Sequence, residues 1–245
     1  MDESRKVIYK IRTKIDSYEV IEEVYTGRKS RLLYGGESKT AQSGIPLDDQ
    51  DKMLFEYNQR LVELALDLKP EHILLIGGGV YTLASYLSKK LTDSFIDIVE
   101  PDTSLDDIAS RYFNYQAKDS VSIIHDFGLS YLMKNKKKYD LIIIDAYSDQ
   151  HIPAEIISKQ FTKLATKSLS RDGLLAANVI SDIRDNSVIS KFHSSYKKYF
   201  KYFNVFPASS DRLYFYPSNL IYTASFKKFD LKLKYPPLSW SGILD

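Results

Sequence analysis

The sequence predicts an α/β fold in which a small N-terminal β-domain precedes a doubly wound, mostly parallel seven-stranded sheet. From His72 onward, apolar strand-like runs alternate with segments whose apolar residues recur at helical spacing, which is the pattern of βα units with right-handed crossovers. Runs such as Leu141–Ile144 are apolar at every position, as expected of strands buried on both faces. The first fifty residues instead carry β-branched and aromatic residues between glycine turns. We therefore expect a β-rich domain over 1–52 and a larger α/β domain over 53–245.

The individual elements follow from the same patterns. Two N-terminal strands are predicted at Val7–Ile11 and Tyr18–Tyr25, with turns at Gly27 and Gly35-Gly36. Apolar residues at helical spacing from Leu54 to Leu68 predict a helix, which Pro70 ends. Strands of the main sheet are predicted at Ile73–Ile76, Phe95–Val99, Val121–Ile124, Leu141–Ile144 and Leu174–Val179. Further helices are predicted over 83–91, 105–112, 161–169 and 188–196. The last two strands, Tyr202–Phe206 and Leu220–Ala224, are expected to be antiparallel because no long helix separates them.

Composition narrows the class of protein. With 245 residues, 44% of them hydrophobic and 27% charged, the chain can bury one sizeable core, or a core plus a small second domain. The net charge of +2 argues against a protein that mainly binds nucleic acid. The lysine-rich run at 134–138 is the one dense basic cluster, and we interpret it as a solvated helix end or loop. The absence of cysteine excludes disulfides, thiolate nucleophiles and zinc–thiolate sites.

The start of the sequence lacks the apolar segment of a signal peptide, and no apolar run approaches the ~20 residues that a membrane helix needs. A soluble cytoplasmic protein without a membrane partner is therefore the expectation. Nineteen tyrosines and twelve phenylalanines are many for this length. Most must lie in the core or line a groove, and aromatic grooves suit ligands that are partly apolar.

Gly77, Gly78 and Gly79 follow a predicted strand and open a predicted helix. Glycines at such a turn allow a sharp bend and let a ligand touch the backbone, so we interpret them as a nucleotide or nucleoside loop. A plain tight turn is the alternative, because a lone glycine loop is a weak signal. Val80-Tyr81-Thr82 do not complete a dinucleotide fingerprint, and the sequence has no GxxxxGK[ST] phosphate loop.

Acidic residues follow three predicted strands at their carboxyl ends, where open α/β sheets bind ligands. Glu100 could accept hydrogen bonds from ribose hydroxyls, or it could be an exposed helix-capping acid. Asp126 could accept from an adenine amino group while Phe127 packs on the ring, or Asp126 could be a helix cap. Asp145 ends the fourth strand of the sheet and could likewise be a turn acid. Carboxylates repel phosphates and attract cations, so the set indicates a sulfonium nucleoside.

From about Tyr18 to Ala224, the sequence resembles the spermidine synthase family, whose members have the class I S-adenosylmethionine-dependent methyltransferase fold. The matching motifs come in the family's order: Arg31-Leu32-Leu33, Gln42-Ser43, Phe55-Glu56-Tyr57, HILLIGGG at His72–Gly79, Pro153-Ala154-Glu155 and LSRDGLL at Leu169–Leu175. The resemblance implies a transferase whose co-substrate is S-adenosylmethionine or its decarboxylated form, with no metal. It also implies a small-molecule amine as the acceptor and makes a homodimer the assembly to test.

The resemblance assigns roles to individual residues. Glu100 and Asp126 match the ribose-binding and adenine-binding acids, and Asp145 matches the catalytic aspartate. Tyr147 would bond the amine or orient Asp145. The implied substrate-binding residues are Gln42, Tyr57 and Asp149. If the family chemistry holds, a primary amine attacks the methylene next to the sulfonium and releases methylthioadenosine. The amine is protonated at neutral pH, with a pKa near ~10, so a carboxylate must take its proton.

The sequence also departs from the family. Val80-Tyr81-Thr82 stand where the family has an aspartate, which holds the aminopropyl ammonium, and two glycines. Asp145 and Asp149 are four residues apart instead of three, and Asn178 replaces a Gln-Gly pair. The family's second substrate tyrosine has two candidate positions, Tyr216-Pro217-Ser218 and Phe206-Pro207.

These departures leave alternatives open. Backbone N–H groups at Val80 and Tyr81 would suit the carboxylate of intact S-adenosylmethionine, so transfer of a methyl or aminocarboxypropyl group is a rival. A non-catalytic nucleoside-binding or partner-binding module on the same fold is a third interpretation, since fold alone does not determine function.

Overall fold

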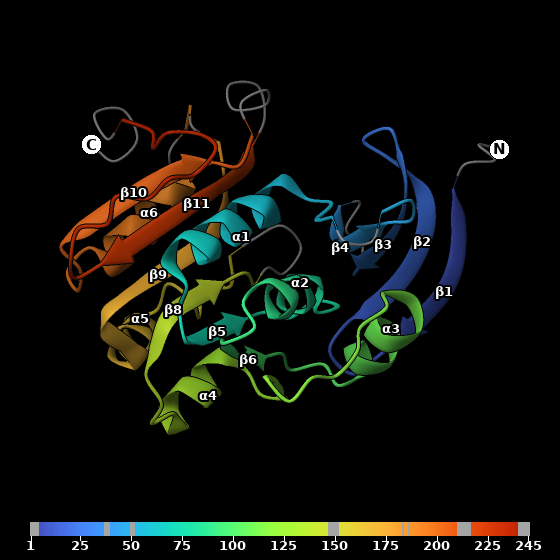
Figure 1. Ribbon diagram of the computed structural model, residues 1–245, viewed down its shortest axis with the longest axis horizontal. Helices are drawn as coiled ribbons and strands as arrows, with labels where there is room; N and C mark the ends of the chain where they lie inside the picture. Colours follow the sequence, from blue (N-terminus) through green and yellow to red (C-terminus); the bar gives the residue numbers. More distant parts are fainter. Residues whose placement is uncertain are drawn as a thin grey trace.

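The computed structural model describes residues 5–36, 40–49, 52–146, 152–182, 184–185, 187–209 and 217–239. The strands of these residues form two sheets (Figure 1). The smaller sheet is antiparallel and contains, in spatial order, β1 (Lys6–Arg12), β2 (Ser17–Tyr25), β3 (Arg28–Gly35) and β4 (Ala41–Pro46). The two predicted N-terminal strands are confirmed, and β3 and β4 complete the sheet.

The larger sheet has seven strands in the order β10-β11-β9-β8-β5-β6-β7. Its members are β5 (His72–Ile76), β6 (Phe95–Val99), β7 (Val121–Ile124), β8 (Tyr139–Ile144), β9 (Leu169–Ser181), β10 (Tyr202–Pro207) and β11 (Ser218–Ser225). Strands β5 to β9 pair in parallel, whereas β11 is antiparallel to both of its neighbours. The predicted order of strands and helices is confirmed, and so is the antiparallel pairing of the last two strands, β10 and β11.

Helices cover both faces of this sheet (Figure 1). They are α1 (Glu56–Leu68), α2 (Thr82–Lys90), α3 (Ser104–Tyr112), α4 (Gly128–Lys134), α5 (Lys159–Ser168) and α6 (Ser187–Tyr196). Along β5, Ile73 and Leu75 pack in the core with α1, α2 and α3, while Leu74 and Ile76 pack in the core with α4, α5 and α6. Successive side chains of a strand point to opposite faces, so a strand covered on both sides is apolar throughout.

Helix α4 was not predicted, because it is short and only Leu132 among its residues is fully buried. The basic run at 134–138 begins at the last residue of α4 and continues into the following loop, as predicted. Leu169 begins β9 rather than ending α5, since it pairs with Tyr139 of β8.

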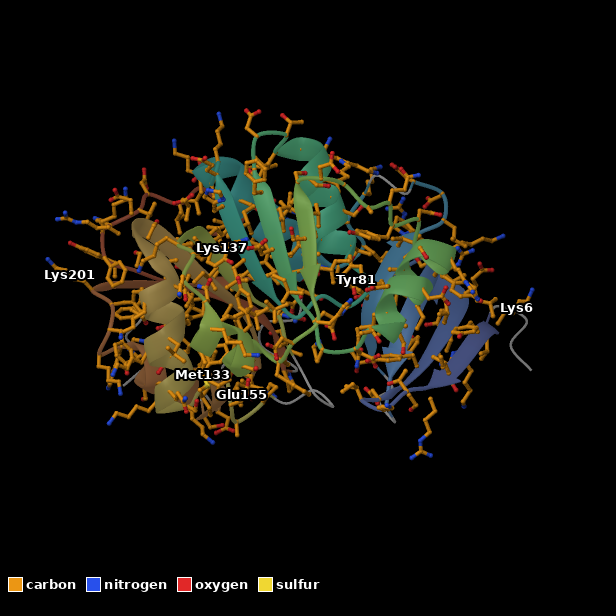
Figure 2. All side chains as sticks on the ribbon, turned by 90° about the horizontal axis from the view of Figure 1, so that it is seen from below. Lys6, Tyr81, Met133, Lys137, Glu155 and Lys201 are labelled. Atoms are coloured by element: carbon orange, nitrogen blue, oxygen red, sulfur yellow. The ribbon has the colours of Figure 1, made fainter. Side chains whose placement is uncertain are left out.

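The two sheets share one hydrophobic core. Val20 and Leu33 of the small sheet belong to the same buried cluster as Leu61 of α1 and Ile73 of β5. Polar contacts reinforce the junction: the Thr13 hydroxyl donates to Asp102 at 2.6 Å, and Arg31 Nη1 donates to the Tyr112 carbonyl at 2.7 Å. The boundary between domains at residues 52 and 53 stays a prediction. Lys6 and Lys201 lie at opposite ends of the molecule (Figure 2).

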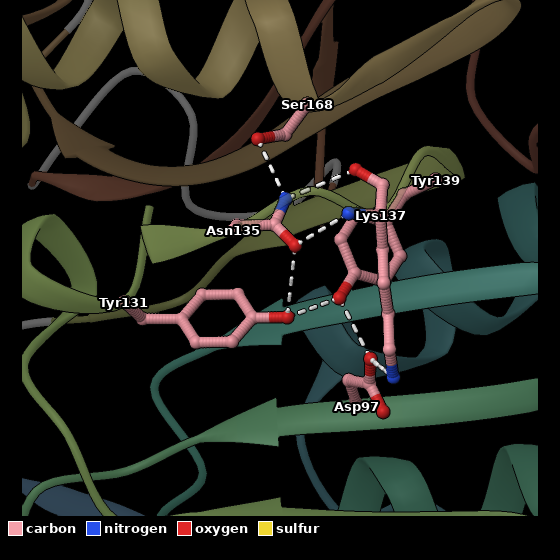
Figure 3. A network of polar contacts seen from close by, with 6 residues as sticks. All are labelled: Asp97, Tyr131, Asn135, Lys137, Tyr139 and Ser168. Atoms are coloured by element: carbon pink, nitrogen blue, oxygen red, sulfur yellow. Dashed lines mark hydrogen bonds and ion pairs between the residues drawn. The ribbon is translucent and has the colours of Figure 1, made fainter. Parts of the chain in front are cut away.

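A buried polar network links β6 to β8 across β5 (Figure 3). Asp97, only 6% exposed, accepts hydrogen bonds of 2.7 Å from both the Tyr139 hydroxyl and Lys137 Nζ. The Tyr131 hydroxyl bonds that of Tyr139, and Asn135 Nδ2 extends the network to Ser168 at 2.9 Å. Burial and the contact with Asp97 raise the pKa of Tyr139, so it stays a hydrogen-bond donor. Within the described part of the chain, no helix is long and apolar enough to cross a membrane.

Candidate active site

A cavity of about 1070 Å³ opens at the carboxyl ends of β5, β6, β8 and β9, where the small sheet and α1 face the large sheet. Most of the predicted site residues line it: Gln42, Tyr57, Gly77, Gly78, Gly79, Glu100, Phe127 and Asp145. Tyr147 and Asp149 lie outside the described residues. Asp126 is described but does not line the cavity. Elements far apart in the sequence therefore converge on one site, as the strand-end acids predicted.

Gly77 allows β5 and β8 to end side by side. Its φ of +95° lies in the region that favours glycine, and a Cβ at this position would stand 2.2 Å from the carbonyl oxygen of Asp145. The Asp145 N–H in turn donates to the carbonyl of Ile76 at 2.9 Å, and the Gly77 N–H donates to that of Val99 at 3.0 Å. The loop and the catalytic candidate are thus held together through their backbones.

Glu100 closes onto the glycine loop. Its carboxylate accepts the N–H of Gly78 at 2.9 Å and that of Asp102 at 3.1 Å, and the side chain is 8% exposed. Burial raises the pKa of Glu100, and the N–H bonds from Gly78, Asp102 and Gly79 oppose that rise. A carboxylate has about four lone-pair sites, so it can also accept from ribose hydroxyls.

Of the residues that replace the family's aspartate and glycines, Thr82 lines the cavity, whereas Val80 and Tyr81 do not. Val80 and Tyr81 are each 1% exposed and belong to the hydrophobic core. The Tyr81 ring packs against Gly78, where a Cβ would stand 2.7 Å from Tyr81 Cε1, and the Tyr81 hydroxyl donates to Asp106 at 2.6 Å. Neither residue lines the cavity, and neither can supply an acid to it.

Asp145 is held by two side chains. Asn178 Nδ2 donates to Asp145 Oδ1 at 2.9 Å, and the Tyr57 hydroxyl of α1 also hydrogen-bonds the carboxyl. Burial raises the pKa of Asp145 to about 6, and these two hydrogen bonds oppose the rise. A carboxylate with this pKa is mostly ionised at neutral pH and binds a proton more readily than an exposed aspartate does. That is the property expected of a general base.

The structure adds residues that sequence reasoning missed. Asn58 of α1 is 3% exposed and lines the cavity, and its Oδ1 has no hydrogen-bond partner among the described residues. The sequence signal that could have identified Asn58 is its position directly after Tyr57, a predicted site residue. Asn219 of β11 also lines the cavity, and its Nδ2 donates to Asn178 Oδ1 at 2.8 Å. No sequence pattern joins two residues that lie 41 positions apart.

Asp126 faces α4 instead of the cavity. Its carboxylate accepts the Phe127 N–H at 2.9 Å and pairs with Lys134 at 3.0 Å. A hydrogen bond from the Ser130 hydroxyl, together with the contact from Lys134, holds the pKa of Asp126 below its usual range. Asp126 does not cap α4, whose N-cap residue is Phe127, so its carboxylate instead pairs with side chains of that helix, and the adenine-binding role stays a prediction. The neighbouring Phe127, 55% exposed, does line the cavity.

Glu155 of the predicted Pro-Ala-Glu motif also lines the cavity and accepts the Leu129 N–H of α4 at 2.9 Å (Figure 2). No cluster of three or more His, Asp or Glu side chains within the described ranges could hold a metal ion.

Known proteins share both the sequence pattern and the fold. The family model for the spermine/spermidine synthase domain matches residues 54–233. A polyamine aminopropyltransferase from Vibrio vulnificus is 34% identical over 139 residues, which cover 55% of this chain and 46% of that protein. One from Streptococcus uberis is 33% identical over 150 residues, or 59% and 52% of the two chains. The chain thus spans about half the length of these relatives.

Solved structures of low sequence identity share the fold. A probable spermidine synthase from Corynebacterium glutamicum superposes with a TM-score of 0.74 at 21% identity, over 91% of this chain and 82% of that one. A spermidine synthase in complex with the transition state analogue AdoDATO gives 0.71 at 20% identity, over 94% and 82%. Human methyltransferase-like protein 13 in complex with SAH gives 0.61 at 20% identity, over 73% and 85%. The predicted fold class is confirmed. Because the family model matches well over half of the sequence, the chain belongs to the spermine/spermidine synthase family.

Proposed function

We propose that this protein transfers an aminopropyl-type group from a sulfonium nucleoside to a small-molecule amine, with Asp145 as the base. The observation that carries the proposal is the meeting of Asp145, Glu100 and the glycine loop in one cavity together with Tyr57. The relatives named polyamine aminopropyltransferases support the same reaction class.

The acidic lining of the cavity supports two positively charged ligands, the donor and the acceptor. Its described lining contains the carboxylates Asp16, Glu56, Glu100, Asp145 and Glu155. Arg28 is the one arginine or lysine in this described lining, and its guanidinium pairs with Asp48 at 2.8 Å. Carboxylates in a partly enclosed cavity attract cations and raise their local concentration. A sulfonium donor and an ammonium-bearing acceptor both match this field.

The donor is decarboxylated S-adenosylmethionine or S-adenosylmethionine. Glu100 would bind the ribose hydroxyls, the glycine loop would approach the ribose, and Phe127 would pack against the adenine. Asn58 offers the donor tail an acceptor, because its buried Oδ1 lacks a partner among the described residues. A buried unpaired acceptor costs free energy, which an ammonium N–H from the ligand would recover. Gln42 of β4 lines the same cavity from the small sheet.

The transfer step is a nucleophilic substitution at carbon. The Asp145 carboxylate takes a proton from the acceptor ammonium, which frees the nitrogen lone pair. The nitrogen attacks the methylene beside the sulfonium, a C–N bond forms, and the C–S bond breaks with its electron pair going to sulfur. Methylthioadenosine leaves as a neutral thioether. The positively charged sulfur is the leaving group, so the protein mainly holds the two reactants in line.

A second candidate is transfer of a methyl or aminocarboxypropyl group from intact S-adenosylmethionine. The apolar Val80 favours it, because the family's ammonium-binding acid has no counterpart there, but the Tyr81 N–H, which we expected to suit a carboxylate, donates to the Gly78 carbonyl at 2.9 Å. The third interpretation, a non-catalytic module, leaves the raised pKa and the two hydrogen bonds of Asp145 without a role. Roles for Tyr147 and Asp149, a homodimer and a cytoplasmic location stay predictions.

Calorimetry with S-adenosylmethionine, its decarboxylated form and methylthioadenosine, followed by product analysis with a primary amine, tests the proposal. Aminopropyl transfer requires the decarboxylated form to bind more tightly than S-adenosylmethionine and to release methylthioadenosine. A preference for intact S-adenosylmethionine, with S-adenosylhomocysteine as a product, would establish the methyltransferase alternative. If none of the three ligands bound, the chain would be the non-catalytic module.

A further inference from the structure

Three polar side chains form a line that ends at Asp145. Asn178 lies on β9, which pairs with β8 on one side and with β11 on the other. Its Nδ2 donates to Asp145 Oδ1 at 2.9 Å, and its Oδ1 accepts from Asn219 Nδ2 at 2.8 Å. Asn178 is 5% exposed, so its amide exchanges few hydrogen bonds with water. The line therefore runs from β11 through β9 to the carboxyl end of β8.

The direction of these hydrogen bonds follows from their chemistry. An ionised carboxylate only accepts hydrogen bonds, whereas an asparagine amide donates from nitrogen and accepts at oxygen. Asp145 is therefore stabilised when Asn178 presents Nδ2 to it. With the amide reversed, Asn178 Oδ1 would face a carboxylate oxygen and the two would repel. Asn219 supports the first orientation, because its Nδ2 donates to Asn178 Oδ1 and leaves Asn178 Nδ2 directed at Asp145.

The orientation of the Asn178 amide affects the carboxyl group of Asp145, the proposed base. The donor from Asn178 holds one oxygen of the carboxyl in place, and Tyr57 supplies the other contact from α1. Tyr57 is the titratable group in direct contact with Asp145, and the remaining influences on the carboxyl are burial and Asn178. Replacing Asn219 would remove the hydrogen bond that Asn178 Oδ1 accepts from β11, and with it one of the contacts that orient the Asn178 amide.

We propose that Asn219 is a positioning residue for this site, which acts through Asn178 to keep an N–H donor on Asp145 and so holds the carboxylate ionised and oriented toward the acceptor amine. The proposal rests on the proposed function for its reaction. The hydrogen-bond line itself is independent of which group is transferred.

The test is a double-mutant cycle of Asn219→Leu and Asn178→Leu, with titration of the Asp145 carboxyl as the readout. Carbon-13 NMR of protein with labelled aspartate follows the carboxyl without substrate, and Asp145→Asn assigns its signal. We expect Asn219→Leu to raise the pKa of Asp145 by about half to one unit, the size that one average hydrogen bond accounts for. In the Asn178→Leu background the second substitution should change nothing further, because residues that act in series are not additive.

Asn219→Asp provides a second route if the leucine variants do not fold. A carboxylate at 219 only accepts, so it should reverse the Asn178 amide and raise the pKa of Asp145 more than Asn219→Leu does. Asn204→Asp on β10 is the matched control, since it adds the same charge to the same sheet outside the cavity. Unchanged titration in Asn219→Leu, additive shifts in the cycle, or equal shifts in Asn219→Asp and Asn204→Asp would each overturn the proposal.

Turnover separates this proposal from the proposed function. We expect Asn219→Leu to lower kcat about tenfold, equivalent to one hydrogen bond's contribution to the barrier, with the Kd for methylthioadenosine unchanged. If the wild-type chain transfers no group but the titration shifts as expected, the positioning role stands and the proposed function falls. If the wild-type chain is active and the titration does not move, the positioning role alone is wrong.

Discussion

Gly77 and Asp145 touch through their backbones: a Cβ on Gly77 would stand 2.2 Å from the Asp145 carbonyl oxygen. The contact joins the loop after β5 to the residue directly after β8. It places the proposed nucleoside loop beside the proposed base at the carboxyl edge of the sheet. Any side chain at 77 would push these two parts of the site apart.

Gly77→Ala is expected to destabilise the protein by about 3 kcal/mol or more, because it adds a steric clash with backbone to the strain of a positive φ. Gly27→Ala is the matched control. Gly27 also has a positive φ, +79°, but nothing lies within 4 Å of its Cβ position, so about 1–2 kcal/mol is expected. Urea unfolding measures both. Equal losses of stability in the two variants would show that the Asp145 contact has no energetic importance.

Asp145→Asn is expected to lower turnover by a factor of about 10²–10⁴, the usual contribution of a general base, while methylthioadenosine still binds. Asp140→Asn serves as the control on the same strand, because Asp140 bonds His72 and Ser170 and does not line the cavity. Steady-state kinetics and calorimetry check the two readouts. Turnover that survives the Asp145 substitution would remove this residue from the mechanism.

The raised pKa of Asp145 makes stability depend on pH. Its folded value of about 6 exceeds the unfolded value of ~3.9, so between those pH values the folded chain holds a proton that the unfolded chain has lost. Wild-type stability therefore falls as pH rises through this window. Asp145→Asn should be more stable than wild type by about 2–3 kcal/mol above pH 7, with little difference below pH 4. A difference that does not vary with pH would contradict the raised pKa.

Lys137→Ala is expected to cost about 1–2 kcal/mol, because it leaves the buried Asp97 with the Tyr139 hydroxyl as its remaining partner within the network of Figure 3. The value is modest because the Lys137 side chain is 65% exposed. Lys136→Ala removes a neighbouring exposed lysine and should be nearly neutral. Thermal unfolding of the two variants compares them. If both were neutral, the ion pair with Asp97 would contribute nothing to stability.

The fold class and the approximate site were predictable from the sequence, because both depend on short-range patterns. A strand such as Leu141–Ile144 is apolar throughout because helices cover both of its faces, and the order of such runs indicates a doubly wound sheet. Parallel strands end at one edge, so Glu100 and Asp145 could be expected to converge. Helix α4 escaped detection because seven residues with one fully buried apolar side chain carry too little periodicity.

Which side chains meet within the site was decided by the tertiary structure alone. The Asn219–Asn178 contact depends on the antiparallel pairing of β11 with β9, and the turning of Asp126 toward Lys134 depends on an unpredicted helix. Tyr81 follows the glycine loop in sequence, yet its ring is buried beneath that loop. Sequence therefore determined the sheet, the strand-end acids and the family resemblance. Hydrogen-bond partners form between residues many positions apart and require a packed interior, so the details of the site around Asp145 appear only in the folded chain.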